Sequence, residues 1–183
     1  MATARASGHL DAADVQRILE ERTAELAQVD EQPTCVETVG LVLFRLGDEW
    51  YGAHLDVVRE IHTDFVATRL PRVPEHVVGV ASVRGEILSV VDPARLLAVR
   101  DAPERRSGRF SSGIIVDAAG RASVLVVDEV GDIVNVPADS LEEPLSSGGA
   151  AGSELVIASV HVGDRLVAVV DVERMLVPLG MTA

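Results

Sequence analysis

The chain contains no lysine: all 16 of its basic residues are arginine, against 29 acidic residues and a formal net charge of −13. The absence excludes a P-loop, whose lysine contacts nucleotide phosphates, and it excludes Schiff-base and pyridoxal chemistry. The acidic balance disfavours nucleic acid and anionic lipid as partners, because both would be repelled. We therefore expect no nucleic-acid binding and no direct insertion into a membrane.

Cysteine and aromatic residues are also scarce. Cys35 is the single cysteine, so neither an intramolecular disulfide nor a Cys-x-x-Cys site can form. Aromatic residues make up 3% of the chain, so aliphatic side chains must fill the core. No apolar run approaches membrane-spanning length, and no apolar signal core follows the first residues. We expect a soluble cytoplasmic protein.

Recognisable catalytic and metal-binding patterns are missing as well. Neither Gly-x-Ser-x-Gly nor Gly-x-Gly-x-x-Gly occurs. Asp92 and Asp171 could form a catalytic carboxylate pair, but each precedes a short predicted helix, and helix capping explains both better. The histidines show no metal-ligand spacing: His9, His54, His62, His76 and His161. We predict no enzymatic activity, no bound cofactor and no metal site. The alternative is an enzyme or a small-ligand-binding module built on two β-barrels.

What the chain does contain is an internal repeat. Residues 90–97, Val-Val-Asp-Pro-Ala-Arg-Leu-Leu, are matched at an offset of 79 by residues 169–176, Val-Val-Asp-Val-Glu-Arg-Met-Leu. The preceding Ala-Ser-Val of residues 81–83 recurs at an offset of 77, which predicts a turn two residues longer in the second copy. A strand-turn-strand-helix unit used twice predicts two similar subdomains.

Short apolar runs separated by turn residues predict a mainly β protein. We expect hairpins over residues 41–54, 80–91, 114–127 and 155–171, with the first repeated in the third at an offset of 73. Residues 56–61 and 75–78 look like short helical segments, and residues 100–112 like a polar connector. Many short strands of this kind are typical of small barrels or sandwiches, here two of them packed by pseudo-twofold symmetry.

The N-terminal residues 1–35 differ in texture and are predicted to form an extension outside the β domain. Residues 11–27 indicate an amphipathic helix with Asp11 as N-cap. Its apolar face comprises Val15, Ile18, Leu19 and Leu26. This helix either docks on its own domain, binds a partner or a second copy, or stays unfolded.

Five ordered motifs make residues 37–177 resemble the CheW family, the coupling proteins of bacterial chemosensory arrays. Ser82 and Pro93 depart from the usual Asn and Leu, which leaves the fold intact and partner specificity open. A CheW-like domain is therefore expected over residues 36–180. The motifs are Val58-Arg59-Glu60-Ile61, Arg69-Leu70-Pro71, Val77-Val78-Gly79-Val80, the run from Ser82 to Pro93, and Val126-Val127-Asp128-Glu129-Val130.

The resemblance implies two five-stranded, SH3-like barrels and a role without chemistry of its own. Such proteins link the cytoplasmic tips of chemoreceptors to the regulatory domain of a CheA-type histidine kinase. A CheW-like paralogue that binds receptors without kinase, or that serves a pilus or gliding pathway, is the alternative. Residue by residue, the resemblance implies receptor contacts at Val58, Glu60, Gly79, Ser82 and Arg84.

For the kinase, the predicted contacts are Leu46, Trp50 and Ile61. A lone tryptophan beside a turn is favoured as an interface residue, although it can also fill part of a core. Arg84 could equally be a solvated turn residue, Glu60 a solvated acid, and Val58 a core residue. Gly79 is expected to allow a receptor helix to approach closely in a groove.

Overall fold

The computed structural model describes residues 37–100, 102–105, 107–118, 120–144 and 152–177, all within one compact unit. The helix predicted over residues 11–27 lies outside the described residues. Within them the protein is mainly β, with a few short helices, as predicted. None of the described helices is long and apolar enough to cross a membrane.

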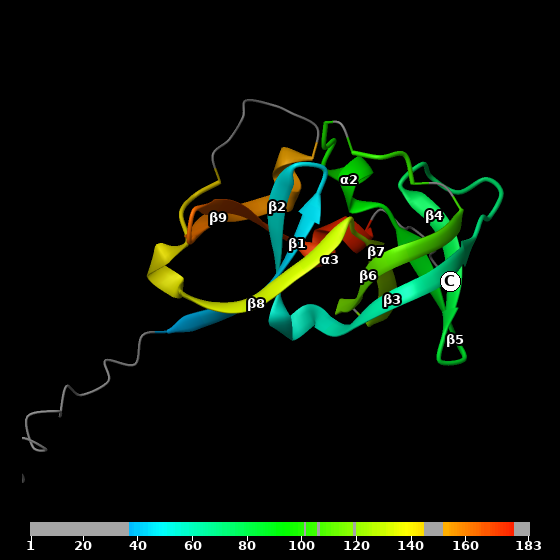
Figure 1. The fold of residues 1–183 in the computed structure, drawn as a ribbon, viewed down its shortest axis with the longest axis horizontal. Helices are drawn as coiled ribbons and strands as arrows, with labels where there is room; N and C mark the ends of the chain where they lie inside the picture. The colour runs from blue at the N-terminus through cyan, green and yellow to red at the C-terminus, as the bar shows by residue number, and fades with distance from the viewer. Residues whose placement is uncertain (1–36, 101, 106, 119, 145–151, 178–183) are drawn as a thin grey trace, which may run out of the picture. The chain divides into compact units, whose positions relative to one another are not determined.

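The middle of the chain forms a closed barrel with the strand order β3-β4-β5-β7-β6, seen in the right half of Figure 1. All neighbours pair in antiparallel fashion except β5 and β7, which are parallel. The strands and the helix after β5 are β3 (Val58–Thr68), β4 (Val77–Val83), β5 (Glu86–Val91), α2 (Pro93–Leu96), β6 (Gly108–Ala118) and β7 (Arg121–Val126).

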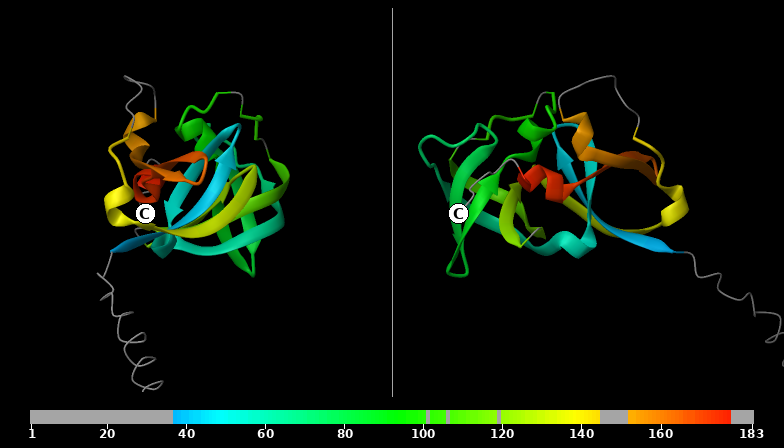
Figure 2. Two further views of the ribbon diagram at one scale, coloured as in Figure 1. Left: turned by 60° about the vertical axis from the view of Figure 1, so that its left-hand side comes forward. Right: turned by 180° about the vertical axis from the view of Figure 1, so that it is seen from behind.

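The two ends of the described chain combine into a second five-stranded sheet, ordered β8-β1-β2-β10-β9. Paired backbone hydrogen bonds of 2.9 Å between Glu142, just after β8, and Ser159 in β9 bring the two edges of this sheet together. The sheet therefore curls into a second barrel beside the first (Figure 2). Its elements are β1 (Thr38–Leu46), β2 (Glu49–His54), η1 (Leu55–Val57), β8 (Glu129–Pro137), η2 (Ala138–Ser140), η3 (Ser153–Leu155), β9 (Val156–Val162), β10 (Arg165–Val170) and α3 (Val172–Leu176).

The two barrels repeat each other residue by residue, but not in the register that the sequence suggested. In one hairpin Val83 pairs with Glu86, and in the other Val162 pairs with Arg165, so both turns contain two residues. The prediction of a longer second turn is wrong, because Ala81 corresponds structurally to Val160 instead of Ala158. The offset of 73 between the first and third hairpins is also wrong by one residue, since Leu46 pairs with Glu49 where Ala118 pairs with Arg121.

Three apolar clusters form the core, one inside each barrel and one between them. Strand β1 shows why its apolar run is continuous: Leu41 and Leu43 face the interior of their own barrel, while Val42 and Phe44 face the cluster between the barrels. A strand buried on both faces carries apolar residues at every position. The helices α2 and α3 complete the middle cluster through Ala94, Val172, Met175 and Leu176.

Two segments were predicted as helical and are largely extended. Residues 58–61 begin the long strand β3, and only residues 55–57 form a 3-10 turn. Val77 and Val78 likewise begin β4. The polar connector is shorter than expected, because β6 already begins at Gly108. Valine-rich segments suit a pleated, half-buried strand better than a helix, and here the barrel pairing decides the outcome.

Candidate functional surface

The β4–β5 hairpin and the start of β3 meet in an exposed, ion-paired ridge, which we define as Val58, Arg59, Glu60, Ser82, Arg84 and Glu86. Arg84 Nη2 lies 3.1 Å from Glu60 Oε2, and Arg59 Nη1 lies 3.0 Å from Glu86 Oε2. The two ion pairs have opposite polarity: β3 contributes the cation to one and the anion to the other, and the hairpin supplies the oppositely charged partners. This arrangement fixes the hairpin beside β3 while leaving the charged groups in contact with solvent.

Arg84 is the most exposed member of the two ion pairs, with 79% of its side-chain surface accessible, whereas Glu60 is 23% accessible. Both turn residues have positive φ, +50° at Arg84 and +86° at Gly85, as a two-residue hairpin turn requires. Glycine adopts this conformation readily, but an arginine does so at some conformational cost. The turn therefore holds the guanidinium outward, at the tip of the hairpin.

The structure brings Glu60, Ser82 and Arg84 of the five predicted receptor residues to the surface of this ridge, while Val58 at its edge is partly buried against the cluster between the barrels. Ser82 is exposed on β4 and pairs across the hairpin with Ile87, which is one of the most exposed large apolar residues described. Sequence reasoning missed Arg59, Glu86 and Ile87. The available signal was that each of them lies within a few residues of a predicted contact residue in the sequence. The ion pairing between β3 and the hairpin is visible only in the folded structure.

Gly79, the fifth predicted receptor residue, lies elsewhere and is buried. Its φ is +154°, and a Cβ at this position would lie 2.1 Å from the carbonyl oxygen of Thr68. The close approach that requires glycine is therefore by the chain's own backbone at Thr68 and Arg69. Gly79 thus positions the start of the β3–β4 loop, and its contact with a receptor helix stays a prediction.

The three residues predicted to contact the kinase do not lie on one surface. Leu46 is fully buried in the cluster between the barrels, so its side chain has no surface to offer. Ile61 is exposed on β3 of the first barrel. Trp50 is half-buried in the second barrel, where the guanidinium of Arg165 lies 4.4 Å from the centre of its ring and Gly131 leaves room for the indole. An arginine stacked on an indole offers a flat, partly apolar contact surface.

A buried ion-pair network joins the two barrels on the side of α2. Arg105 donates to Asp92 Oδ1 at 2.7 Å and to Asp128 Oδ1 at 2.6 Å, and the other oxygen of Asp128 accepts from the Gly47 backbone N–H at 2.7 Å. Burial raises the pKa of Asp92, and the charge of Arg105 opposes that rise. Because each carboxylate is paired and hydrogen-bonded, the network is a structural clamp instead of a reactive pair.

Asp92 and Asp171 each cap the helix that follows, as predicted. Asp92 accepts from the Ala94 backbone N–H at 3.1 Å, and Asp171 from the Arg174 backbone N–H at 3.0 Å. Among the described residues, no three His, Cys, Asp or Glu side chains lie close enough together to hold a metal ion.

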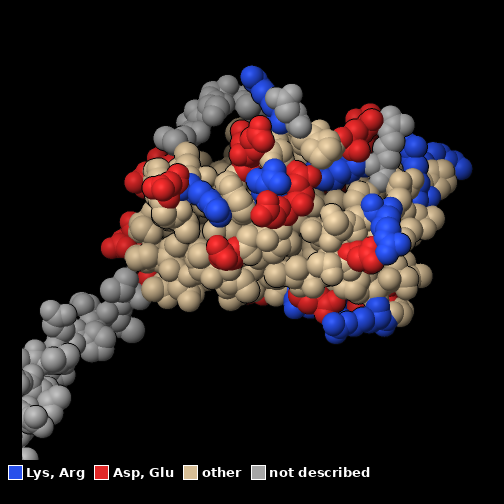
Figure 3. Space-filling model, in the orientation of Figure 1, with Lys and Arg blue, Asp and Glu red and all other residues tan. Residues whose placement is uncertain are grey.

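On the face shown in Figure 3, acidic and basic side chains lie next to one another, and basic groups gather at its right-hand end.

Two packed β-barrels with an exposed ion-paired ridge define an interaction module. Residues 40–178 match the family model described as CheW-like domain, and the chain therefore belongs to this family. It is a coupling scaffold of chemotaxis signal transduction, and the proteins of this family are scaffolds.

Individual relatives agree with the family. The chain is 30% identical over 143 residues to the chemotaxis protein CheW of Klebsiella aerogenes, covering 76% of this chain and 84% of the relative. It is 31% identical over 114 residues to protein PilI of Pseudomonas aeruginosa, covering 62% of each. The fold matches the crystal structure of the scaffolding protein TtCheW from Thermoanaerobacter tengcongensis with a TM-score of 0.65 at 24% identity, over 74% of this chain and 90% of that one.

Proposed function

We propose that this protein couples the cytoplasmic tips of methyl-accepting chemoreceptors to the regulatory domain of a CheA-type histidine kinase. It acts in the cytoplasm at the receptor arrays and catalyses no reaction itself. Its effect on phosphorylation arises from positioning the kinase and from an energetic link between its two binding sites.

The ridge is the proposed receptor contact, and the Glu60–Arg84 pair is the observation that carries it. The side chain of Arg84 is 79% exposed and only one of its nitrogens lies close to Glu60, so its remaining donors are available to a partner. An arginine held in this way can form a planar, bidentate contact with a carboxylate or with backbone carbonyls. Ser82 precedes the turn on β4 and Ile87 adds an exposed apolar side chain, whereas Val58 would contribute through its partly buried position at the start of β3.

Trp50 and Ile61 are the proposed kinase contacts, and they lie on different barrels. Trp50 stacked under Arg165 resembles the aromatic and arginine anchors that dominate interface energies. Leu46 supports this region from the core. The spacing of these residues over two barrels fits a partner with the same fold, which meets barrels edge to edge.

Calorimetric titration with a receptor-tip fragment and, separately, with the kinase regulatory domain tests this function. We expect Arg84→Ala to weaken receptor binding about tenfold, which corresponds to the loss of one charge-assisted hydrogen bond. Arg121→Ala, at the exposed turn between β6 and β7, is the matched control and leaves both affinities unchanged. Kinase binding is unchanged in both variants.

The charge-swapped variant Glu60→Arg/Arg84→Glu separates a partner contact from a purely internal one. If the pair only holds the hairpin to β3, swapping the charges restores receptor binding. We expect no restoration, because a partner carboxylate would then meet an anion at position 84 in place of a cation. Full receptor affinity in Arg84→Ala, or full rescue by the swap, would contradict the proposal.

The similarity to protein PilI favours a second candidate, a CheW-like paralogue of a pilus or gliding pathway. A paralogue that binds receptors without kinase belongs to the same alternative. Receptor binding without any binding to the kinase domain in a folded sample would support it over the first proposal.

A further inference from the structure

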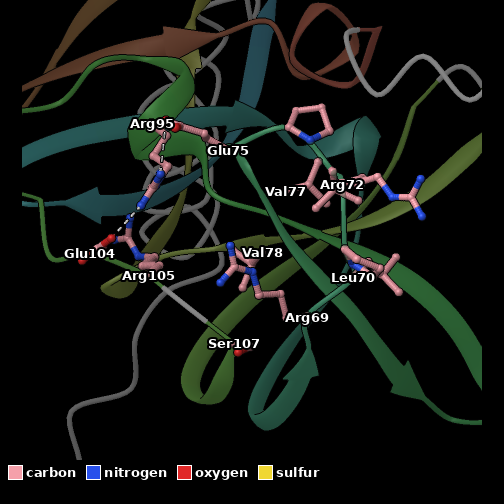
Figure 4. Close-up of a pocket in the computed structure, with 13 residues that line it drawn as sticks. Arg69, Leu70, Arg72, Glu75, Val77, Val78, Arg95, Glu104, Arg105 and Ser107 are labelled. Atoms are coloured by element: carbon pink, nitrogen blue, oxygen red, sulfur yellow. Dashed lines mark hydrogen bonds and ion pairs between the residues drawn. The ribbon is translucent and has the colours of Figure 1, made fainter.

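A pocket of about 600 Å³ opens between the β3–β4 loop, the helix α2 and the connector before β6 (Figure 4). Its charged lining consists of four arginines and two glutamates: Arg69, Arg72, Arg95, Arg105, Glu75 and Glu104. Asp92 and Asp128 balance the charge of Arg105, so the cationic character of the lining rests on the other arginines, in a chain whose net charge is −13. The lining coincides with the basic end of the molecule in Figure 3, where the β3–β4 loop lies.

Two of these arginines have no acidic partner among the described residues, namely Arg69 and Arg72. The guanidinium of Arg69 points toward Arg105 and Glu104 in Figure 4. By contrast, Arg105 is almost completely buried and its charge is balanced by Asp92 and Asp128, so it is a fixed structural part of the pocket wall. Two arginines without an acidic partner, close together at one pocket, form a site that favours an anion.

Arg95 can exchange its partners. Its nitrogens lie 3.7 Å from Glu75, 3.3 Å from Glu104 and 3.6 Å from Asp92, all longer than a tight arginine–carboxylate contact of about 2.8 Å. The Glu75 side chain is 94% exposed, so this pair is held weakly. An incoming carboxylate could take the place of Glu75 with little loss.

The loop that carries Arg69 and Arg72 is pre-shaped. Pro71 and Pro74 restrict its backbone, and the Val77 backbone N–H donates to the Pro74 carbonyl at 2.9 Å. Buried Gly79 packs directly against the backbone of Arg69, where the loop starts. A site that is ordered before the ligand arrives loses less entropy on binding.

The apolar lining sets the kind of ligand. Leu70, Val73 and Val77 line the same pocket as the arginines. Nucleic acid and anionic membranes are extended polyanions that would also meet the rest of a chain whose net charge is −13, whereas a short peptide would contact the pocket alone. We propose that this pocket binds an acidic peptide segment of a partner protein, with carboxylates on Arg69, Arg72 and Arg95 and an apolar side chain against Leu70 and Val77. This inference is independent of the proposed ridge contact.

Fluorescence anisotropy of the full chain tests it with an end-blocked, fluorescein-labelled peptide, Glu-Glu-Leu-Glu-Glu, and the corresponding glutamine peptide as reference. We expect binding of the acidic peptide only, weakened about tenfold or more in Arg69→Gln/Arg72→Gln, since each lost charged contact is worth about that factor. Arg121→Gln is the control for a lost surface charge. Both variants should keep the thermal midpoint of the unaltered protein, because all three arginines are exposed.

Three outcomes would overturn the proposal. The first is equal binding of the acidic and glutamine peptides, and the second is unchanged affinity in the double variant. The third is binding of inorganic phosphate, at constant ionic strength, that depends on Arg69 and Arg72 while the peptide does not bind, which would define a small-anion site instead. Chemical-shift changes on peptide addition, confined to the backbone amides of residues 69–78, would support the proposed location.

Discussion

The two copies of the Val-Val-Asp motif share their local structure and differ in what lies around them. In both, the backbone N–H of the aspartate donates at 2.8 Å to a carbonyl just before the preceding hairpin, that of His76 for Asp92 and that of Leu155 for Asp171. In both, the aspartate caps a short helix. Only Asp92 is sealed from solvent, because Arg105 reaches it from a connector that has no counterpart beside Asp171 among the described residues. Local sequence sets the turn and cap, and a distant residue sets the electrostatics.

The largest change in the free energy of unfolding is expected when Arg105, the residue that distinguishes the first copy, is removed. Arg105→Ala leaves Asp92 and Asp128 without their cation in a buried site, and loss of one partner from a buried pair costs about 3–5 kcal/mol. Urea denaturation measures the change in the free energy of unfolding. In the second copy, Arg174 pairs with Asp171 at the surface, so Arg174→Ala should change it by less than about 1 kcal/mol. Equal effects of the two substitutions would show that the buried clamp has no special role.

A smaller effect is expected at Gly79, whose counterpart in the second copy is Ala158. Gly79→Ala places a Cβ against the Thr68 carbonyl at an unfavourable φ, so it should destabilise by about 1–3 kcal/mol. It should also displace the β3–β4 loop and so weaken peptide binding at the arginine pocket. Ala158→Gly should cost only about 0.5–1 kcal/mol. Denaturation curves of the two variants, measured together, show whether the backbones differ as described.

The smallest effect is expected at His76, which occupies the place of Leu155. Burial lowers the pKa of His76, and its Nε2 is buried without a hydrogen-bond partner. The unfolded chain therefore takes up a proton more readily than the folded protein, and stability falls as the pH drops below the ordinary histidine pKa of about 6.5. His76→Leu should remove this loss between about pH 7 and pH 5.5, measured as the denaturation midpoint at each pH. An unchanged pH dependence would mean that the pKa of His76 is the same in the folded and the unfolded chain.

Much of this fold could be predicted from the sequence, because its turns and apolar runs have local causes. The hairpin turning at Arg84-Gly85 needs a two-residue turn between valine-rich strands, and the caps need only an aspartate before a short helix. The recurrence of Ala-Ser-Val led to a wrong alignment of the two copies. Residue identity aligned Ala81 with Ala158, whereas the inward or outward direction of the side chains aligns it with Val160. Ala81 and Val160 both point into a barrel, and that decides their equivalence.

The candidate site was predictable only in part. Glu60 and Arg84 were expected at a contact surface, and the fold joins them directly. The buried ion pairs of Arg105 with Asp92 and Asp128 could not be predicted from the sequence. Arg105 lies in a polar connector beside other arginines, and only the long-range packing of the fold brings it next to these two carboxylates. At Gly79 the sequence indicated a close approach without showing what approaches, and in the structure the backbone of Thr68 and Arg69 does so.

The interleaved strand order has a consequence for synthesis on the ribosome. Residues 58–126 supply every strand of the closed barrel, so that barrel can form as soon as its last strand emerges. The hairpin of β1 and β2 must wait for β8, β9 and β10, and closing so long a segment is slow. During that interval Val42 and Phe44 can pack against the finished barrel, but Leu41 and Leu43 lack the side chains of β8, β9 and β10 that cover them in the complete protein. The newborn chain should therefore engage a chaperone through its first strand, and release it when its last hairpin arrives.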